Sequence, residues 1–142
     1  MRRLVIDASI TLSWLLPDEG SASSLKARNE LFSTETVWVP SHWRLEVANS
    51  LWMAERRKRL DSAGIARAVS LFLQLPVTID SETNLHAGTE TLALSREHGI
   101  SVYDAAYLEL ALRRGATLAS LDGQLRTASR KVGVVTLPTS LA

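Results

Sequence analysis

The N-terminal stretch of the chain reads Arg2-Arg3-Leu4-Val5-Ile6-Asp7-Ala8-Ser9. Its centre is a short apolar run rich in β-branched residues, which is typical of a strand buried on both faces of a parallel sheet. The run ends in a carboxylate, Asp7, and a helical pattern begins directly after it. Because open parallel sheets bind ligands just beyond the carboxyl ends of their strands, Asp7 stands where chemistry is expected.

Short apolar runs alternate with helical patterns through the rest of the chain. Further strands are expected at 37–39, 77–79, 117–120 and 134–136, and helices at 10–16, 22–32, 42–59, 62–74, 81–98, 101–114 and 123–131. This alternation predicts the α/β class, a three-layer α/β/α sandwich with a mostly parallel central sheet. The length of 142 residues fits a single domain that spans 1–142.

Composition excludes several classes of protein. Hydrophobic residues make up 46% and charged residues 22%, which indicates a folded globular chain. The formal net charge of +1 means that nucleic-acid binding would need a local basic patch. The absence of cysteine excludes a disulfide scaffold, a thiolate zinc site and a cysteine nucleophile. No apolar run approaches the ~18 residues of a membrane span, and the N-terminus is a poor signal peptide, so a soluble cytoplasmic protein is expected.

Four acidic residues stand at the positions where a parallel sheet would gather them. Asp7 follows the first predicted strand and Asp122 follows the fourth. Asp104 lies near the start of the helix before the fourth strand. Glu46 lies in the second turn of the helix after the second strand, and Ser41 is the expected cap of this helix. Strand ends and the first turns of the following helices share one edge of such a sheet, so we expect these carboxylates to converge.

Carboxylates that lie close together repel one another, which raises the pKa of some of them unless a cation is present. Mg²⁺ takes oxygen ligands, keeps several waters and needs only one or two carboxylates. A bound metal ion activates water and stabilises charge on a phosphoryl oxygen. The set therefore indicates phosphodiester hydrolysis by water, although each acid alone could be a helix cap, a turn residue or a solvated side chain.

The same acids lie within short motifs that occur in a fixed order along the chain. These are Val5-Ile6-Asp7-Ala8-Ser9, Leu45-Glu46-Val47-Ala48-Asn49, Tyr103-Asp104-Ala105-Ala106-Tyr107-Leu108 and Ser120-Leu121-Asp122. In these motifs the chain resembles the PIN-domain ribonucleases, and in size and layout it resembles their VapC-type toxins from toxin–antitoxin pairs. The resemblance implies an Mg²⁺- or Mn²⁺-dependent ribonuclease with RNA as substrate, an antitoxin protein as partner, and a homodimer.

The resemblance also assigns roles to individual residues. Asp7 and Asp104 would bind the metal, and Glu46 and Asp122 would complete the acidic cluster. Ser9 would orient the carboxylate of Asp7. Asn49 would support Glu46, since residues three apart share one face of a helix.

Three further features have two readings each. The run Arg56-Arg57-Lys58-Arg59 either complements a helix dipole or contacts RNA phosphates. Trp14 and Trp52 either join the core or form an apolar groove for a partner helix. The three histidines, His42, His86 and His98, are scattered and are not expected to form a metal site or a catalytic triad.

Two other functions remain open at this point. A phosphatase could use Asp7 as its nucleophile, but such enzymes usually carry a second acid close after it, and Ala8 and Ser9 stand there instead. A non-catalytic binding module would keep its function when the acids are neutralised. The sequence does not choose the RNA target, the antitoxin, the oligomer, or the identity and number of the metal ions.

Overall fold

A computed structural model describes residues 3–17, 22–33 and 36–139 of the chain. Within these residues one five-stranded sheet has the order β3-β2-β1-β4-β5, and every neighbouring pair is parallel. The strands are β1 (Arg3–Ile6), β2 (Thr36–Val39), β3 (Thr78–Ile79), β4 (Thr117–Ala119) and β5 (Thr136–Leu137). The predicted parallel sheet is therefore confirmed, with the N-terminal strand at its centre.

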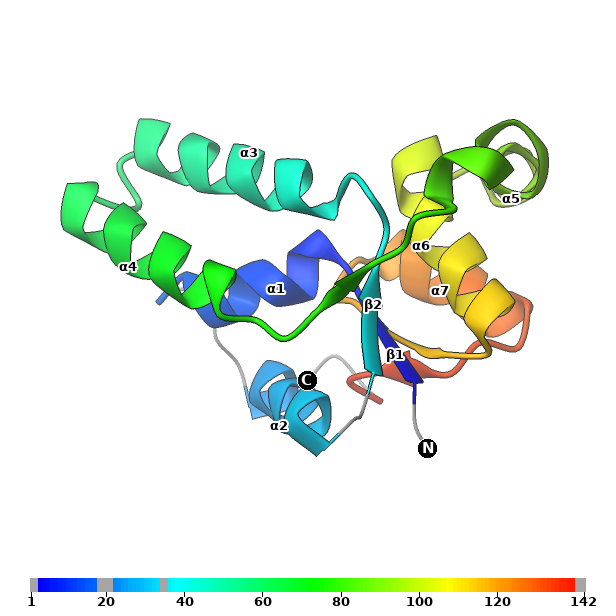
Figure 1. The fold of residues 1–142 in the computed structure, drawn as a ribbon, viewed down its shortest axis with the longest axis horizontal. Helices are drawn as coiled ribbons and strands as arrows, with labels where there is room; N and C mark the ends of the chain where they lie inside the picture. The colour runs from blue at the N-terminus through cyan, green and yellow to red at the C-terminus, as the bar shows by residue number, and fades with distance from the viewer. Residues whose placement is uncertain (1–2, 18–21, 34–35, 140–142) are drawn as a thin grey trace.

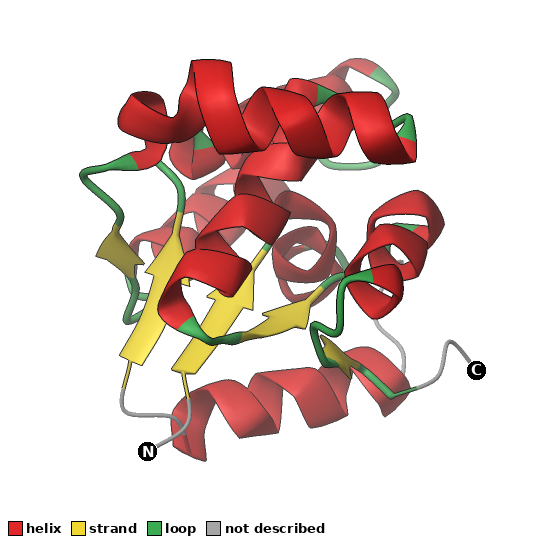
Figure 2. Ribbon diagram, turned by 90° about the vertical axis from the view of Figure 1, so that its right-hand side faces the viewer, coloured by secondary structure: helices red, strands yellow, loops and turns green. Residues whose placement is uncertain are grey.

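Helices cover both faces of the sheet. They are α1 (Ala8–Leu15), α2 (Ala22–Ser33), α3 (Trp43–Arg56), α4 (Ser62–Leu73), α5 (Leu92–His98), α6 (Val102–Arg114) and α7 (Gly123–Lys131). Figure 1 shows α1 and α2 on one side of the strands, α6 and α7 on the other, and α3 and α4 running beside each other away from the sheet. Figure 2 shows the strands between these helical layers. The predicted three-layer α/β/α sandwich is confirmed. No helix in the described part of the chain is long and apolar enough to cross a membrane.

The central strand explains why the N-terminal run is apolar. Leu4, Val5 and Ile6 are at most 2% exposed, because β1 has a strand on each side and a helical layer on each face. Each such side chain stabilises the fold by roughly 1.5–3 kcal/mol through burial. The backbone N–H of Asp7 continues the ladder by donating to the carbonyl of Ala119 at 3.1 Å. The acid at the end of β1 is thus held on a rigid part of the molecule.

The segment predicted as one helix over 81–98 is broken into three pieces. It consists of a 3-10 turn, η1 (Thr83–His86), a π-helical turn, η2 (Ala87–Thr91), and α5. Two physical reasons are visible. Gly88 is a weak helix former, and the Thr83 and Thr89 hydroxyls bond to the carbonyls of Asp80 and His86, which competes with regular helix geometry.

Two predicted boundaries were also wrong. Ser41 does not cap α3: its N–H donates to the Thr83 hydroxyl, His42 takes the cap position, and Glu46 therefore lies in the first turn rather than the second. The last strand begins at Thr136 rather than at 134. The N–H of Val134 bonds back to Ser129, so this residue still belongs to the turn after α7.

Candidate active site

Asp7 ends β1 and caps α1, and both of its carboxylate oxygens are engaged. Oδ1 accepts hydrogen bonds from the Ser9 hydroxyl at 2.7 Å and from the Ile10 N–H at 3.0 Å. Oδ2 accepts a hydrogen bond from the Ser120 hydroxyl at 2.5 Å. The side chain has little freedom to rotate, since donors from the ends of β1 and β4 hold it from two sides.

The electrostatic environment of Asp7 favours a nearby cation. The residue is only 4% exposed, and burial raises the pKa of its carboxyl group to about 6. The hydrogen bonds from Ser120, Ile10 and Ser9 lower this pKa, and the negative charge of Asp104 raises it further. The effect of burial on this pKa thus outweighs the effect of three hydrogen bonds. A positive ion nearby would therefore stabilise the ionised carboxylate.

The serines at Asp7 form one connected network. Ser9 accepts the N–H of Leu121 at 2.9 Å, and Ser120 accepts the N–H of Asp122 at 3.0 Å. The Ser9 hydroxyl donates to Asp7, and its role as the residue that orients this carboxylate stays a prediction. Ser120 was not singled out from the sequence, although its place at the end of the neighbouring strand, two residues before Asp122, was an available signal.

Glu46 reaches the same region from the first turn of α3. Its Oε1 accepts the Tyr107 hydroxyl at 2.6 Å and lies 3.1 Å from Nε2 of His42. Burial alone would raise the pKa of Glu46, but the hydrogen bonds from His42 and Tyr107 outweigh burial and hold this pKa below its ordinary value. A carboxylate with a lowered pKa stays ionised near neutral pH.

Neither partner of Glu46 was assigned a role from the sequence. His42 lies one helical turn before Glu46 and contacts it, a pairing that was not predicted from the sequence. Tyr107 was quoted only as part of a motif. Its spacing of three residues from Asp104 on α6 places both on one helix face.

Asp104 and Asp122 complete the group through the first turns of two helices. Burial raises the pKa of Asp104, and the negative charges of Asp122 and Glu46 raise it further. Asp122 caps α7, where its Oδ1 accepts the N–H of Leu125 at 2.8 Å. The capping explanation therefore holds for Asp122. Asp7 and Asp122 follow the parallel neighbours β1 and β4, and Asp104 interacts electrostatically with Asp7, Glu46 and Asp122. This placement agrees with the expected convergence of the four acids at one edge of the sheet.

The donors present fit a hard divalent cation. Within the described ranges no three His, Asp or Glu side chains already stand in the arrangement of a metal cluster. Mg²⁺ does not require one, because it binds through one or two carboxylates and retains waters. Asp7 and Asp104 offer carboxylate oxygens. Burial raises the pKa of both carboxyl groups, and neighbouring carboxylates raise these pKa values further, so a cation would stabilise the ionised forms.

The remaining predicted positions are more peripheral. Asn49 is exposed on α3, one turn beyond Glu46. The basic run 56–59 is exposed at the end of α3, where the Arg56 guanidinium lies 4.8 Å from the centre of the Trp52 ring. An RNA contact by this run stays a prediction.

A second charged cluster fixes the helix that carries two site residues. Asp80 is fully buried after β3, and Arg113 of α6 binds it through two hydrogen bonds of 3.0 and 2.7 Å. Burial raises the pKa of Asp80, but the hydrogen bonds from Arg113 and Thr83 outweigh it and lower this pKa to about 2. The pair ties α6 to the edge of the sheet and so positions Asp104 and Tyr107.

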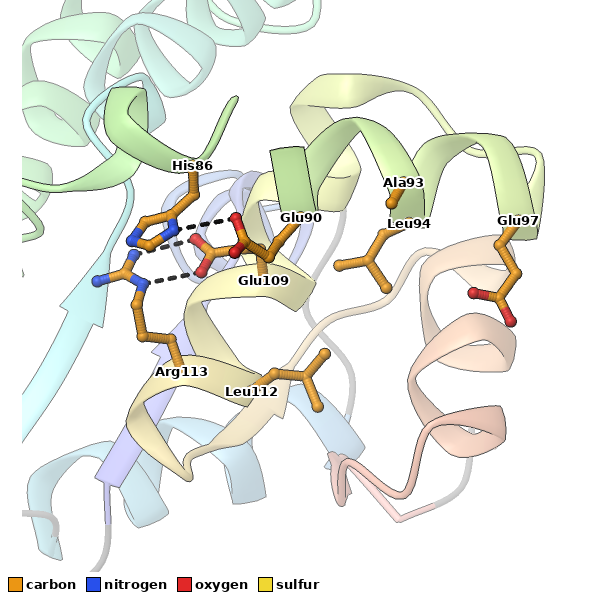
Figure 3. Close-up of a pocket in the computed structure, with 8 residues that line it drawn as sticks. All are labelled: His86, Glu90, Ala93, Leu94, Glu97, Glu109, Leu112 and Arg113. Carbon is orange, nitrogen blue, oxygen red and sulfur yellow. Dashed lines mark hydrogen bonds and ion pairs between the residues drawn. The ribbon is translucent and has the colours of Figure 1, made fainter. Parts of the chain in front are cut away.

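A hollow separate from the acidic site is lined in part by the second charged cluster. It has a volume of about 530 Å³ and lies between α6 and the η2–α5 segment. Figure 3 shows Arg113 paired with Glu109 on one wall, and His86 paired with Glu90 beside it. None of the four site acids lines this hollow.

Comparison with known proteins agrees with this arrangement. The sequence profile described as PIN domain matches residues 4–131, which is nearly the whole chain. The chain belongs to the PIN domain family. It is 30% identical over 123 residues to a protein named ribonuclease VapC3 from Pyrobaculum aerophilum, covering 87% of this chain and 92% of that one.

Solved structures share the fold at lower identity. The crystal structure of PAE2754 from Pyrobaculum aerophilum superposes with a TM-score of 0.70 at 21% identity, covering 97% of this chain and 85% of that chain. VapBC2 from Rickettsia felis, solved bound to a DNA fragment from its promoter, gives a TM-score of 0.63 at 13% identity over 94% of this chain and 96% of that chain. At such identities the likeness supports the PIN fold alone.

Proposed function

We propose that this PIN-domain protein is an endoribonuclease that hydrolyses RNA phosphodiesters with water as nucleophile, dependent on Mg²⁺ or Mn²⁺. The observation that carries the proposal is that two interacting carboxyl groups both have raised pKa values. The buried Asp7 has a pKa of about 6, and the pKa of Asp104 is also raised. Two carboxyl groups with raised pKa values at one sheet edge are best satisfied by a divalent cation. The name of the VapC3 relative supports RNA as the substrate.

Each site residue has a distinct task in this reaction. Asp7 and Asp104 hold the cation, and Ser9 and Ser120 fix the Asp7 oxygens in place. When bound, the cation neutralises charge that develops on the phosphodiester and makes water a better nucleophile. Asp122 adds negative charge that strengthens cation binding.

Glu46 is the group that can orient the attacking water. Its carboxylate is held by Tyr107 and His42 and keeps its charge at neutral pH. An ionised carboxylate in a fixed position accepts a hydrogen bond from water and can receive its proton. Tyr107 and His42 act through Glu46 and are positioning residues.

A phosphatase in which Asp7 attacks phosphorus is less well supported. Hydrogen bonds to both oxygens make a carboxylate a weaker nucleophile, whereas an oxygen with one remaining lone pair can still bind a cation. Here Oδ1 carries two hydrogen bonds and Oδ2 carries one short hydrogen bond from Ser120. Asp7 is better suited to hold a cation than to form a covalent intermediate.

The biological role we propose is that of the toxin in a toxin–antitoxin pair, acting on cytoplasmic RNA as a homodimer. A partner surface is available on the α1–α4 side. Trp14 lines a hollow of about 160 Å³ with Leu71 and Leu75, and Trp52 is 51% exposed on α3. An antitoxin helix with apolar side chains at helical spacing would fit such a surface.

The test of the enzymatic proposal is cleavage of a labelled single-stranded RNA by the purified protein. We expect cleavage with Mg²⁺, loss of cleavage in EDTA, and recovery when Mg²⁺ or Mn²⁺ is restored. Asp7→Asn should abolish it. Asp61→Asn is the matched control, because Asp61 caps α4 far from the site and asparagine caps equally well. Equal cleavage by the Asp7 variant would overturn the proposal.

A further inference from the structure

A small hollow lies directly beside the acidic site. It has a volume of about 130 Å³ and is bounded by the loop before α3, the η1–η2 segment and the first turns of α6. Two of its lining residues also belong to the edge of the site. His42 places Nε2 3.1 Å from Glu46, and Tyr103 immediately precedes Asp104. Any group in this hollow is therefore adjacent to the proposed point of cleavage.

Two rings form one side of the hollow. The rings of His42 and Tyr103 are 5.8 Å apart and tilted by 55° to each other. Tyr103 is 65% exposed, although it is a large aromatic side chain. Exposed aromatic faces next to a nucleic-acid site are stacking platforms for bases, because every base presents a π-face.

A buried hydroxyl without a partner belongs to another residue of the lining. Thr91 of η2 is 2% exposed, and its Oγ1 has no hydrogen-bond partner among the described residues. A buried polar group left without a hydrogen bond costs free energy. Thr91 lines the hollow, so a change of its side-chain rotamer when a ligand enters would bring Oγ1 to the ligand and satisfy this hydroxyl.

Other polar groups of the lining match the edge of a base. Asn84 supplies both a donor and an acceptor. His42 Nε2 lies 3.1 Å from the carboxylate of Glu46 and 3.1 Å from the carbonyl of Tyr103, so this nitrogen carries the hydrogen. In the neutral ring Nδ1 is then an acceptor. No Lys or Arg is found among the described residues that line the hollow, which disfavours a phosphate as occupant.

We propose that this hollow is a nucleobase subsite, which binds the base of one nucleotide flanking the phosphodiester that is cut. Tyr103 stacks on the base, and Thr91 and Asn84 form hydrogen bonds with its edge. The volume is well below the roughly 300–1,000 Å³ of typical small-molecule sites, so one planar ring enters while the sugar and phosphate stay outside, towards Asp104. This subsite rests on the proposed ribonuclease function. It would make cleavage depend on which base flanks the phosphodiester.

The experiment compares short RNAs that carry one abasic nucleotide at each position around the cleavage point. For the wild-type protein with Mg²⁺, removing the base at one position should lower kcat/KM by roughly 5- to 150-fold, the range expected for loss of one stacked base. Tyr103→Ala should lower kcat/KM on the intact RNA by a similar factor. For this variant, kcat/KM on the intact RNA and on the abasic RNA should be the same. Tyr103→Phe keeps the ring and should behave as the wild type.

Thr91→Val isolates the hydrogen bond from the stacking. It replaces an unpaired buried hydroxyl by a group of the same shape, so the fold should be retained. We expect weakened base preference at the same position. Thr78→Val, on the exposed strand β3, is the matched control and should keep the wild-type preference.

The outcomes separate the two proposals. If the wild-type protein cuts no RNA with Mg²⁺, the ribonuclease proposal fails and the subsite fails with it. If the wild type cuts RNA but Tyr103→Ala and Thr91→Val retain its position-dependent response to abasic nucleotides, the subsite alone is overturned.

Discussion

Neutralising Asp7 should make the metal-free protein more stable at neutral pH. The carboxyl group is buried, and its pKa in the folded protein is raised to about 6. In the unfolded chain an aspartate titrates near pH ~3.9. The difference of about two pKa units corresponds to about 3 kcal/mol of free energy of unfolding. Asp7→Asn removes this cost because the amide is uncharged at every pH.

The sign of the pH dependence follows from which state binds the proton more tightly. Below about pH 4 the Asp7 carboxyl group is protonated in both states and costs nothing. As the pH rises towards about 6, the unfolded chain gives up this proton first, so the stability of the wild-type protein falls. Above about pH 6 the full penalty remains. The stability of Asp7→Asn relative to the wild type should therefore increase by about 2–3 kcal/mol between pH 4 and pH 7.5.

The assay is urea unfolding of both proteins in EDTA at several pH values. Titrating groups that do not interact with Asp7 are shared and cancel in the difference. Asp104 interacts with Asp7, and loss of the Asp7 charge relieves repulsion on Asp104, which changes the difference in the same direction. Two results would refute the conclusion that the buried Asp7 carboxylate destabilises the fold. One is a difference in stability that does not change with pH, and the other is an Asp7→Asn variant less stable than the wild type at pH 7.5.

Three further results are expected. Tyr107→Phe removes the hydroxyl that holds Glu46, and kcat/KM for RNA cleavage should fall roughly tenfold or more with an unchanged circular dichroism spectrum. Arg113→Met leaves the buried Asp80 carboxylate without its bidentate partner and should lower the free energy of unfolding by about 3 kcal/mol in urea. Saturating Mg²⁺ should stabilise the wild type, by about 2.7 kcal/mol at 100 times the Kd. Asp104→Asn should lose most of that gain in a thermal-shift measurement.

The fold was predictable because its signals are local. The apolar run Leu4–Ile6 ends in an acid and is followed by a helix, and the alternation repeats through the chain. Burial on both faces of β1 leaves few alternatives to a parallel sheet. One error occurred where a tertiary contact overrode the local pattern: the N–H of Ser41 is bound by Thr83 from a distant segment. The errors within 81–98 and at Val134 have local causes, which are weak helix formation at Gly88, threonine hydroxyls bonded to nearby carbonyls, and a turn back to Ser129.

The acids of the site could be predicted from the sequence, but the residues that form hydrogen bonds with them could not. Asp7 stands out because a carboxylate after a buried strand needs compensation. Ser120 and Tyr107 support Asp7 and Glu46 across 113 and 61 residues of sequence, a separation that no spacing rule covers. His42 lies close to Glu46 in sequence, yet a lone histidine carries too little pattern to be singled out.

In the proposed reaction, Asp7 and its neighbours promote attack of water on an RNA phosphodiester. Cleavage of RNA in ¹⁸O-labelled water with Mg²⁺, followed by mass spectrometry of the new ends, tests this reaction. Attack by water predicts a linear phosphate monoester with one ¹⁸O, formed by the wild type and not by Asp7→Asn or in EDTA. A 2′,3′-cyclic phosphate at the new end, or labelled product formed equally by the Asp7 variant, would contradict the account.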